Sequence, residues 1–162
     1  MLAAAGDKLG TIEINVHADP SGSSIYKETE GGQVNGLSRN VHMVTIDGLC
    51  KDKNLSGPYL VKVDAQGAEL RVLDGAKKVL EDTELIILEV SLFQLYVNGP
   101  QFYDVIQYMK VHGFVVYDIF GGHNRPLDGA LAQIDLVFVK ENGEFRKEHS
   151  YRRLPTEQAQ EA

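Results

Sequence analysis

The residues "LVKVDAQGAEL", Leu60–Leu70, join a buried-looking strand to a helix across one sharp turn. The nearly continuous apolar run up to Asp64 is typical of a strand covered on both faces. Gly67 permits a tight turn, or the close approach of a ligand to the backbone. After the turn, apolar residues recur at helical spacing: Val72, Leu73, Ala76, Val79 and Leu80. The stretch therefore predicts a strand, a turn and a helix, and Gly75 is expected to divide that helix in two.

Further elements are predicted on both sides of this unit from the spacing of apolar residues. Strands are expected over residues 11–17, 41–47, 58–64, 84–91, 114–120 and 132–140. A second helix is expected within residues 97–113, where Pro100 suits the first turn and Gly113 the end. Polar or glycine-rich segments without a period are predicted as connections, over residues 18–40, 48–57 and 121–130.

Strands that alternate with helices predict an α/β fold, in which a mostly parallel sheet is flanked by helices. The last two strands are joined without a helix, so the final strand is expected to insert antiparallel. In such sheets ligands bind beyond the carboxyl ends of the strands, and a functional site is expected there. The length of the chain predicts one domain, residues 1–153, followed by a polar tail over residues 154–162.

Two carboxylates lie at that edge of the predicted sheet. Asp64 ends one strand and Glu89 lies near the end of the next, so both are expected to point to the same rim. Each has a structural alternative, since Asp64 can cap the following helix and Glu89 can serve a buried polar partner. Glu69 falls in the first turn of the helix, where it is expected to cap free N–H groups or to compensate the helix dipole at the surface.

The composition is that of an ordinary globular protein, and it narrows the classes of function. Of the 162 residues, 43% are apolar and 24% charged, and the net charge is −7. An acidic chain lacks the basic face that nucleic-acid binding requires. No apolar run approaches the ~20 residues that span a bilayer, and no signal peptide is visible. With Cys50 as the single cysteine, these features predict a cytoplasmic protein without a nucleic-acid or membrane partner.

Five stretches taken together resemble the FkbM family of methyltransferases. They are "VTIDGL", "PYLVKVDAQGAELRVLDGAKKVL", "LIILEVS", "YDVIQYMKVHGFVVYDIF" and "LAQIDLVFVK". The most specific part is a run of lysine, an apolar residue, aspartate, two variable residues, glycine, alanine and glutamate. It falls here on Lys62, Asp64, Gly67, Ala68 and Glu69. The strand that ends near Glu89 and the later pair Gln133 and Asp135 also fit, and the resemblance covers roughly residues 8–140.

The resemblance implies a Rossmann-like fold and S-adenosylmethionine as cofactor, with methyl transfer mostly to oxygen. Such folds have a glycine-rich loop after the first strand and a ribose-binding acid after the second, and neither is found in this sequence. The chain therefore resembles the C-terminal two-thirds of such an enzyme, with an incomplete Rossmann-like sheet. Cofactor binding by this chain alone is expected to be weak, and unpaired sheet edges favour a homo-oligomer.

The resemblance also implies roles for individual residues. Asp64 and Glu89 are the first candidates for catalysis, as a base or as groups that orient the acceptor hydroxyl. Glu69 and His123 are the next candidates, although a solvated loop histidine is the structural alternative for His123. Asp64 and Gly67 are the candidate cofactor-binding residues.

Two functions of different classes stay open on the sequence. The first is an O-methyltransferase, or a fragment of one, that acts on a small-molecule or sugar acceptor. The second is a truncated, non-catalytic module that only binds a partner. A magnesium site at Asp64, Glu89 and His123 is a third idea, but the ligands are not closely spaced and no metal site is predicted. Asp135, which interrupts an apolar strand, is expected to be structural rather than catalytic.

Overall fold

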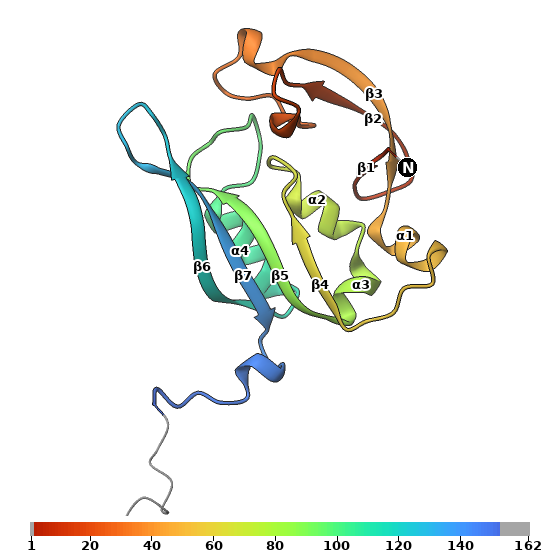
Figure 1. Cartoon of the computed structure of the whole chain (residues 1–162), viewed down its shortest axis with the longest axis vertical. Coiled ribbons are helices and arrows are strands. Elements are labelled where there is room, and N and C mark those ends of the chain that lie inside the picture. The colour runs from red at the N-terminus through yellow and green to blue at the C-terminus, as the bar shows by residue number, and fades with distance from the viewer. Residues whose placement is uncertain (1, 153–162) are drawn as a thin grey trace, which may run out of the picture.

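A computed structural model describes residues 2–152, and the polar tail predicted over residues 154–162 lies outside the described residues. The chain forms two separate β-sheets, which are connected by a short helix, and other helices lie against the larger sheet (Figure 1). The smaller sheet has the order β1-β3-β2, with β1 (Ala4–Ala5), β2 (Gly10–Val16) and β3 (Leu37–Val44). The larger sheet has the order β4-β5-β7-β6, with β4 (Tyr59–Val63), β5 (Thr83–Ser91), β6 (Phe114–Asn124) and β7 (Leu131–Lys140).

The pairing of the strands corrects the expected single, mostly parallel sheet. Strands β4 and β5 are parallel, as predicted, and β7 lies antiparallel between β5 and β6, which confirms the antiparallel last strand. In the smaller sheet, β1 and β3 are parallel but β2 and β3 are antiparallel. The sheets are split because no strand of residues 2–152 pairs with the outer edge of β4. Antiparallel pairs therefore outnumber parallel pairs by three to two in this part of the chain.

Short helices connect the strands within residues 2–152. The α-helices are α1 (Ile46–Asp52), α2 (Glu69–Asp74), α3 (Lys77–Glu81) and α4 (Phe102–Val111), and the 3-10 helices are η1 (Pro20–Gly22), η2 (Gly32–Asn35) and η3 (Glu144–Arg146). The predicted division of one helix at Gly75 is confirmed, since α2 ends just before this glycine and α3 begins after it. Helix α4 starts after its cap Gln101, so Pro100 precedes the helix instead of occupying its first turn.

Helix α1 occupies residues that the sequence predicts as the end of a strand and a connection. Thr45 ends the strand because its hydroxyl oxygen accepts the Gly48 N–H at 3.0 Å, which caps the new helix. Asp47, in the first turn of α1, accepts the N–H groups of Lys78 and Val79 at 3.1 and 3.0 Å. Because α3 has no cap from its own N-cap residue, this carboxylate supplies one and fixes α1 against α3.

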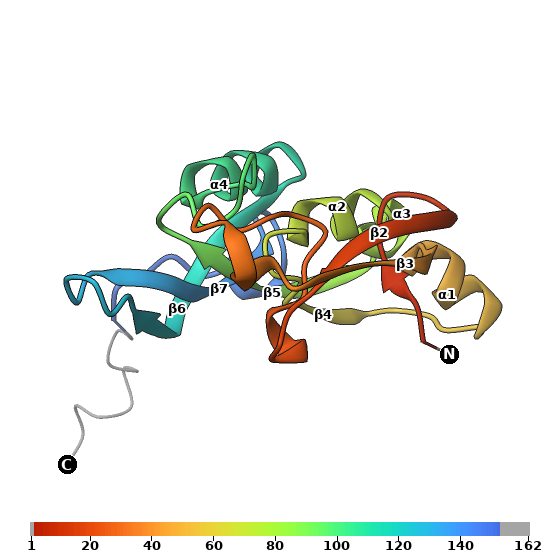
Figure 2. The same ribbon diagram turned by 90° about the horizontal axis from the view of Figure 1, so that it is seen from above.

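The hydrophobic core lies between the larger sheet and helices α2, α3 and α4, which all cover the same face (Figure 2). Side chains that are at most 1% exposed meet there from both layers: Leu73, Ile86, Leu88, Met109, Leu136 and Phe138. Burial of each such side chain contributes about 1.5–3 kcal/mol. The opposite face carries none of these helices, so the prediction of helices on both faces is wrong for the described part of the chain. Leu60 and Tyr117 accordingly stay 65% and 52% exposed.

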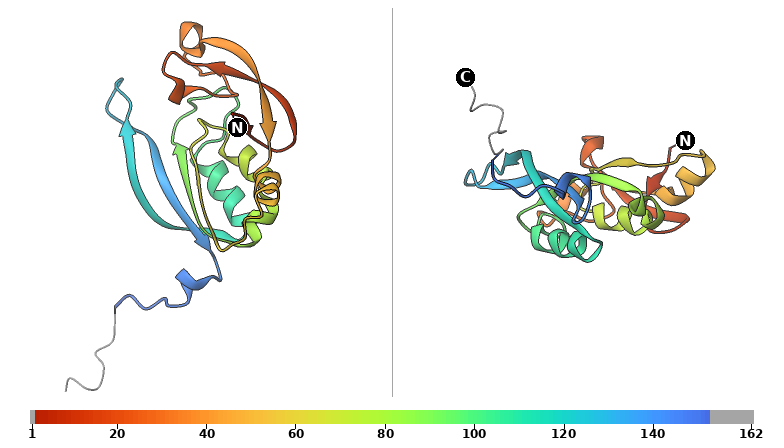
Figure 3. Two further views of the ribbon diagram at one scale, coloured as in Figure 1. Left: turned by 45° about the vertical axis from the view of Figure 1, so that its right-hand side comes forward. Right: turned by 90° about the horizontal axis from the view of Figure 1, so that it is seen from below.

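The segment between β2 and β3 is fixed over the carboxyl ends of β4 and β5 (Figure 3). The Thr29 N–H donates to the Leu95 carbonyl at 2.9 Å, and the Val97 N–H donates to the Lys27 carbonyl at 2.7 Å. These hydrogen bonds join it to the connection between β5 and α4. The loop predicted over residues 18–40 is therefore shorter than expected, because β3 begins at Leu37, and it is held in place by backbone pairing.

Strand β6 continues through residues that the sequence predicts as a polar loop. Gly121 and Gly122 have φ angles of 61° and 97°, which glycine tolerates, so the strand bulges there without ending. His123 then pairs with Gln133 of β7. The predicted loop histidine is consequently part of the sheet. No helix among residues 2–152 combines the length and the apolar character that crossing a membrane requires.

Candidate active site at the carboxyl ends of the strands

The carboxylates of Asp64 and Glu89 lie on the same edge of the larger sheet. Asp64 follows β4 directly, and Glu89 lies near the end of the parallel neighbour β5. The Nε2 of Gln66 donates to the Asp64 Oδ1 at 2.9 Å and to the Glu89 Oε2 at 3.3 Å. One amide group therefore bridges both acids, and the convergence expected from the strand order is found.

Glu89 is held by amides and surrounded by further charges. Its Oε2 also accepts the Gln133 Nε2 at 2.9 Å, and Gln133 is only 7% exposed. Asp135 lies directly opposite Glu89 in the register of β5 and β7. Burial raises the pKa of Glu89, and the charges of Asp64 and Asp135 raise it further, while His123 and the amide of Gln66 act in the opposite direction. This carboxyl group thus binds its proton more tightly than an ordinary glutamate.

The side chain of Asp64 is 43% exposed and makes two polar contacts within residues 2–152. The Lys62 Nζ lies 3.3 Å from its Oδ2, and the Gln66 amide binds its Oδ1. Helix α2 begins after Ala68 and has no cap from a side chain of that N-cap residue. The hydrogen bonds of Asp64 therefore go to side chains, and the alternative that it caps the following helix is wrong. Its free surface faces the solvent at the rim.

Glu69 is buried, in contrast to the surface alternative for this residue. It is 3% exposed, and its Oε1 accepts the N–H groups of Ala65 and Gly67 at 2.9 and 3.1 Å. The expected role as a cap for free backbone groups is confirmed, although the groups belong to the preceding turn. Burial raises the pKa of Glu69, and its hydrogen bonds from backbone N–H groups oppose that shift. Glu69 holds the turn that carries Gln66.

The turn after β4 depends on Gln66, a residue that the sequence does not single out. Gln66 and Gly67 have φ angles of 50° and 90°, so both adopt the left-handed region. The Ser24 hydroxyl donates to the Gln66 carbonyl at 2.7 Å, and the Tyr96 hydroxyl donates to the Gln66 Oε1 at 2.8 Å. A Cβ on Gly67 would lie 2.7 Å from the Tyr96 ring. The close approach that Gly67 permits is therefore made by Tyr96.

A polar cleft of about 470 Å³ opens beside these residues. Gln66 and Gln133 line it together with Tyr96, and its two walls come from residues 28–30 and from the tip of the β6–β7 hairpin, residues 125–127. In that tip, the guanidinium of Arg125 lies 3.9 Å from the centre of the Phe93 ring. We call this space the polar cleft. Glu89 does not line the cleft itself, but its hydrogen-bond partners Gln66 and Gln133 do.

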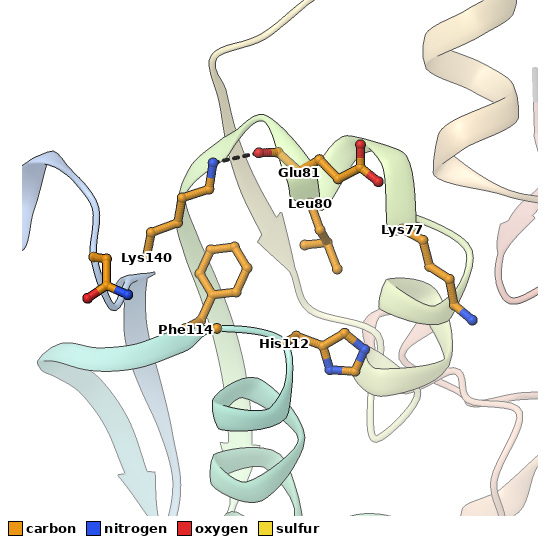
Figure 4. A pocket seen from close by; sticks show the side chains of 8 residues that line it. Lys77, Leu80, Glu81, His112, Phe114 and Lys140 are labelled. Atoms are coloured by element: carbon orange, nitrogen blue, oxygen red, sulfur yellow. Dashed lines mark hydrogen bonds between the residues drawn. The ribbon is translucent and has the colours of Figure 1, made fainter.

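Two other cavities flank the larger sheet, and only the first of them lies away from this arrangement. One, of about 530 Å³, is at the amino ends of the strands, and Figure 4 shows that Lys77 extends away from its apolar residues Leu80 and Phe114. There the Nζ of Lys140 donates a hydrogen bond to the Glu81 carbonyl at 2.5 Å. None of the predicted site residues lines it. The other, of about 370 Å³, lies along the outer edge of β4 and reaches Asp64.

The structure brings Asp64, Glu89, Gly67 and Glu69 to one rim, with His123 on the neighbouring part of β6. In residues 2–152 no group of three or more histidine, cysteine, aspartate or glutamate side chains is arranged to hold a metal ion. Gln66 and Tyr96 are the contacts that the sequence does not predict. The only local signal for Gln66 is its place between two acids and before a glycine in a tight turn.

Comparison with known proteins gives one match. The family model of the methyltransferase FkbM domain matches residues 2–116. The matched span contains β4 and β5 with Asp64, Gly67, Glu69 and Glu89, whereas His123, Gln133 and Asp135 follow it. Searches of the curated proteins and of the solved structures found no match.

Proposed function

The chain belongs to the FkbM family of methyltransferases, and we propose that it serves the transfer of a methyl group from S-adenosylmethionine to a hydroxyl oxygen of a small molecule or sugar. One observation carries this proposal. Two carboxylates from adjacent parallel strands share the Gln66 amide, and they do so next to a polar cleft. Such an arrangement suits a reaction in which a hydroxyl must be oriented and lose its proton.

The described residues do not fit a complete site for S-adenosylmethionine. The cavity along β4 is lined mostly by apolar side chains, and Asp64 is the only carboxylate that residues 2–152 contribute to it. The residue after β1, Gly6, donates its N–H to the Val44 carbonyl, and the Met43 sulfur lies where a Cβ would point. The N–H of this glycine is therefore not free for a cofactor.

Glu89 is the group that we assign as the base. Its Oε2 is held by Gln66 and Gln133, and no hydrogen bond to its Oε1 forms within the described residues. That oxygen is free to accept the proton of an acceptor hydroxyl at the rim beside the polar cleft. The raised pKa of Glu89 makes it a stronger base than an exposed glutamate once it is ionised. His123, opposite Gln133 in the sheet, is the second candidate for this role.

Asp64 and Glu69 have supporting roles in this proposal. Asp64 lies on the other side of the Gln66 amide, lines the cavity along β4 instead of the polar cleft, and fixes that amide by accepting its hydrogen bond. Glu69 touches no part of the cleft and acts through the backbone of the turn, so it is a positioning residue. Gly67 likewise serves the turn and the packing of Tyr96.

A binding module without catalysis is the second candidate function. It is favoured by the poor fit of the described residues to the cofactor. An assay with labelled S-adenosylmethionine at millimolar concentration and a panel of sugars and cyclitols separates the two. Transfer above the level of a protein-free control supports the methyltransferase. No transfer to any member of the panel, by a chain shown to be folded, would favour the binding module.

The chain alone is predicted to bind the cofactor only weakly. Titration of the chain with S-adenosylhomocysteine in a calorimeter is expected to give no saturating heat at micromolar ligand, because the N–H of Gly6, the glycine that follows β1, is already bound to the Val44 carbonyl and the cavity along β4 is mostly apolar. The Asp64→Asn variant, titrated in parallel, is expected to behave identically. A dissociation constant in the micromolar range for the unaltered chain would contradict this account of the cavity along β4.

A further inference from the structure

The polar cleft carries negative charge that no described cation neutralises. Glu28 and Glu30 line one wall, and neither forms an ion pair within residues 2–152. Glu89 adjoins the cleft through its contacts to Gln66 and Gln133, which both line it. A ligand in this cleft therefore meets the carboxylates of Glu28 and Glu30 on one wall, and the charge of Glu89 lies behind the amides of Gln66 and Gln133.

Arg125, the cation that the described residues place on the opposite wall, is already paired with Asp128. The Nε and Nη2 of Arg125 donate to both carboxylate oxygens of Asp128, at 2.8 and 2.5 Å. The guanidinium also lies over the Phe93 ring. Because Asp128 balances this charge within the hairpin tip, Arg125 adds little attraction for an anionic ligand. The cleft as a whole stays negative.

The hydrogen-bonding groups that face the cleft are mainly acceptors. Gln133 is 93% buried, and its Nε2 donates hydrogen bonds to Glu89 and Ser91. Its Oε1 accepts no hydrogen bond from the described residues. The Nε2 of Gln66 likewise donates hydrogen bonds to Asp64 and Glu89. The amide donors are thus engaged, and the unpaired amide oxygen of Gln133 is left for a donor from outside. This observation is independent of the charge of the walls.

We infer that the acceptor is an amino polyol, a sugar or cyclitol that carries a protonated amine beside its hydroxyl groups. Hydroxyl and ammonium groups donate the hydrogen bonds that the Gln133 Oε1 and the carboxylates of Glu28 and Glu30 accept. The cleft volume of about 470 Å³ lies in the range of small-ligand sites, and it is walled in part by the aromatic residues Phe93 and Tyr96. That this ligand is the methyl acceptor rests on the proposed function. Its chemistry, a polyol with a protonated amine, is tested by binding alone.

Binding of three monosaccharide probes without cofactor tests the inference. Glucosamine, glucose and glucuronate are titrated into the labelled chain, at a pH where the amine is protonated, and the amide signals of Gln66 and Gln133 are followed by NMR. Glucosamine is expected to bind about 5-fold to 10-fold more tightly than glucose, as one or two partly exposed carboxylates contribute. Glucuronate is expected to bind more weakly than glucose.

The double variant Glu28→Gln and Glu30→Gln is expected to remove the preference for glucosamine and to leave glucose binding within about 2-fold, because only the charge is lost. Glu81→Gln, in the cavity at the other end of the sheet, is the matched control and is expected to change neither value. Equal or tighter binding of glucuronate, an unchanged preference in the double variant, or no binding of any probe would each overturn the inference. Because no cofactor is present, a failed transfer assay does not affect this result, and a failed titration leaves methyl transfer to other hydroxyls intact.

Discussion

Glu89→Gln is expected to lower the rate of methyl transfer by about 100-fold to 10,000-fold, the range typical for loss of a general base. Glutamine has nearly the same shape and keeps an oxygen that can accept from Gln66 or Gln133, so the rim should persist. The proton of the acceptor hydroxyl would then have no carboxylate to receive it. The measurement is the initial rate with labelled cofactor at millimolar concentration.

The dependence of the transfer rate on pH in the unaltered chain is a second test of Glu89 as the base. A base must be ionised to act, so the rate should rise with pH through the raised pKa of Glu89, above the ordinary value of 4.5. Glu84→Gln is the control, because Glu84 lies on the same strand at its opposite end and pairs with Lys140. A Glu89→Gln variant that transfers methyl as fast as the Glu84→Gln variant would remove Glu89 from the role of base. His123 would then be the remaining candidate.

Glu69→Ala is expected to lower the free energy of unfolding by about 2–4 kcal/mol, because one buried and one partly buried N–H group lose their acceptor. Those groups belong to Ala65 and Gly67, and the carboxylate is 3% exposed. Glu69→Gln keeps an acceptor oxygen and removes a buried charge, so its cost is expected to stay below about 1.5 kcal/mol. Urea denaturation of both variants checks the difference.

The control for this second prediction is Glu81→Ala. Glu81 lies in α3, is exposed, and uses only its backbone carbonyl for Lys140, so its replacement should change stability by no more than about 0.5 kcal/mol. If Glu69→Ala costs as little as Glu81→Ala, Glu69 does not hold the turn. The positions of Gln66 and Gly67 would then need another cause.

Local patterns in the sequence predict the elements that line the core. The uninterrupted apolar run before Asp64 and the similar run of β5 give two parallel strands, and Gly75 divides the intervening helix. These predictions succeed because burial on one face of a helix, or on a strand, imposes a period on the sequence itself. The antiparallel last strand follows as well, since a short connection without a helix cannot cross over to a parallel position.

Elements that depend on distant partners are not predicted. Helix α1 starts at a Thr45 cap inside a run that has the alternation of a strand, and Asp47 finds its partners on α3, 31 and 32 residues away. The split into two sheets is equally invisible in the sequence, because it depends on which strand edges pair. The sequence therefore gives the strands of the larger sheet but not the arrangement of the smaller one.

In the candidate site, too, some features can be predicted from the sequence and others cannot. The meeting of Asp64 and Glu89 at one edge follows from the direction of two neighbouring parallel strands, and so can be predicted. Burial of Glu69 cannot, because its carboxylate folds back to the preceding turn instead of pointing to solvent. The central place of Gln66 also depends on contacts across the fold, from Ser24, Glu89 and Tyr96.

The shared rim of Asp64 and Glu89 is tested most directly by the pKa of Glu89, measured by NMR of its carboxyl carbon as the pH is changed. The account predicts that this pKa lies above 4.5 in the unaltered chain, since burial and the Asp64 charge both raise it. Asp64→Asn removes a like charge from the same rim, so the pKa of Glu89 should fall in that variant. A pKa of Glu89 at or below 4.5, or one that does not respond to Asp64→Asn, would place the two acids apart and contradict the account.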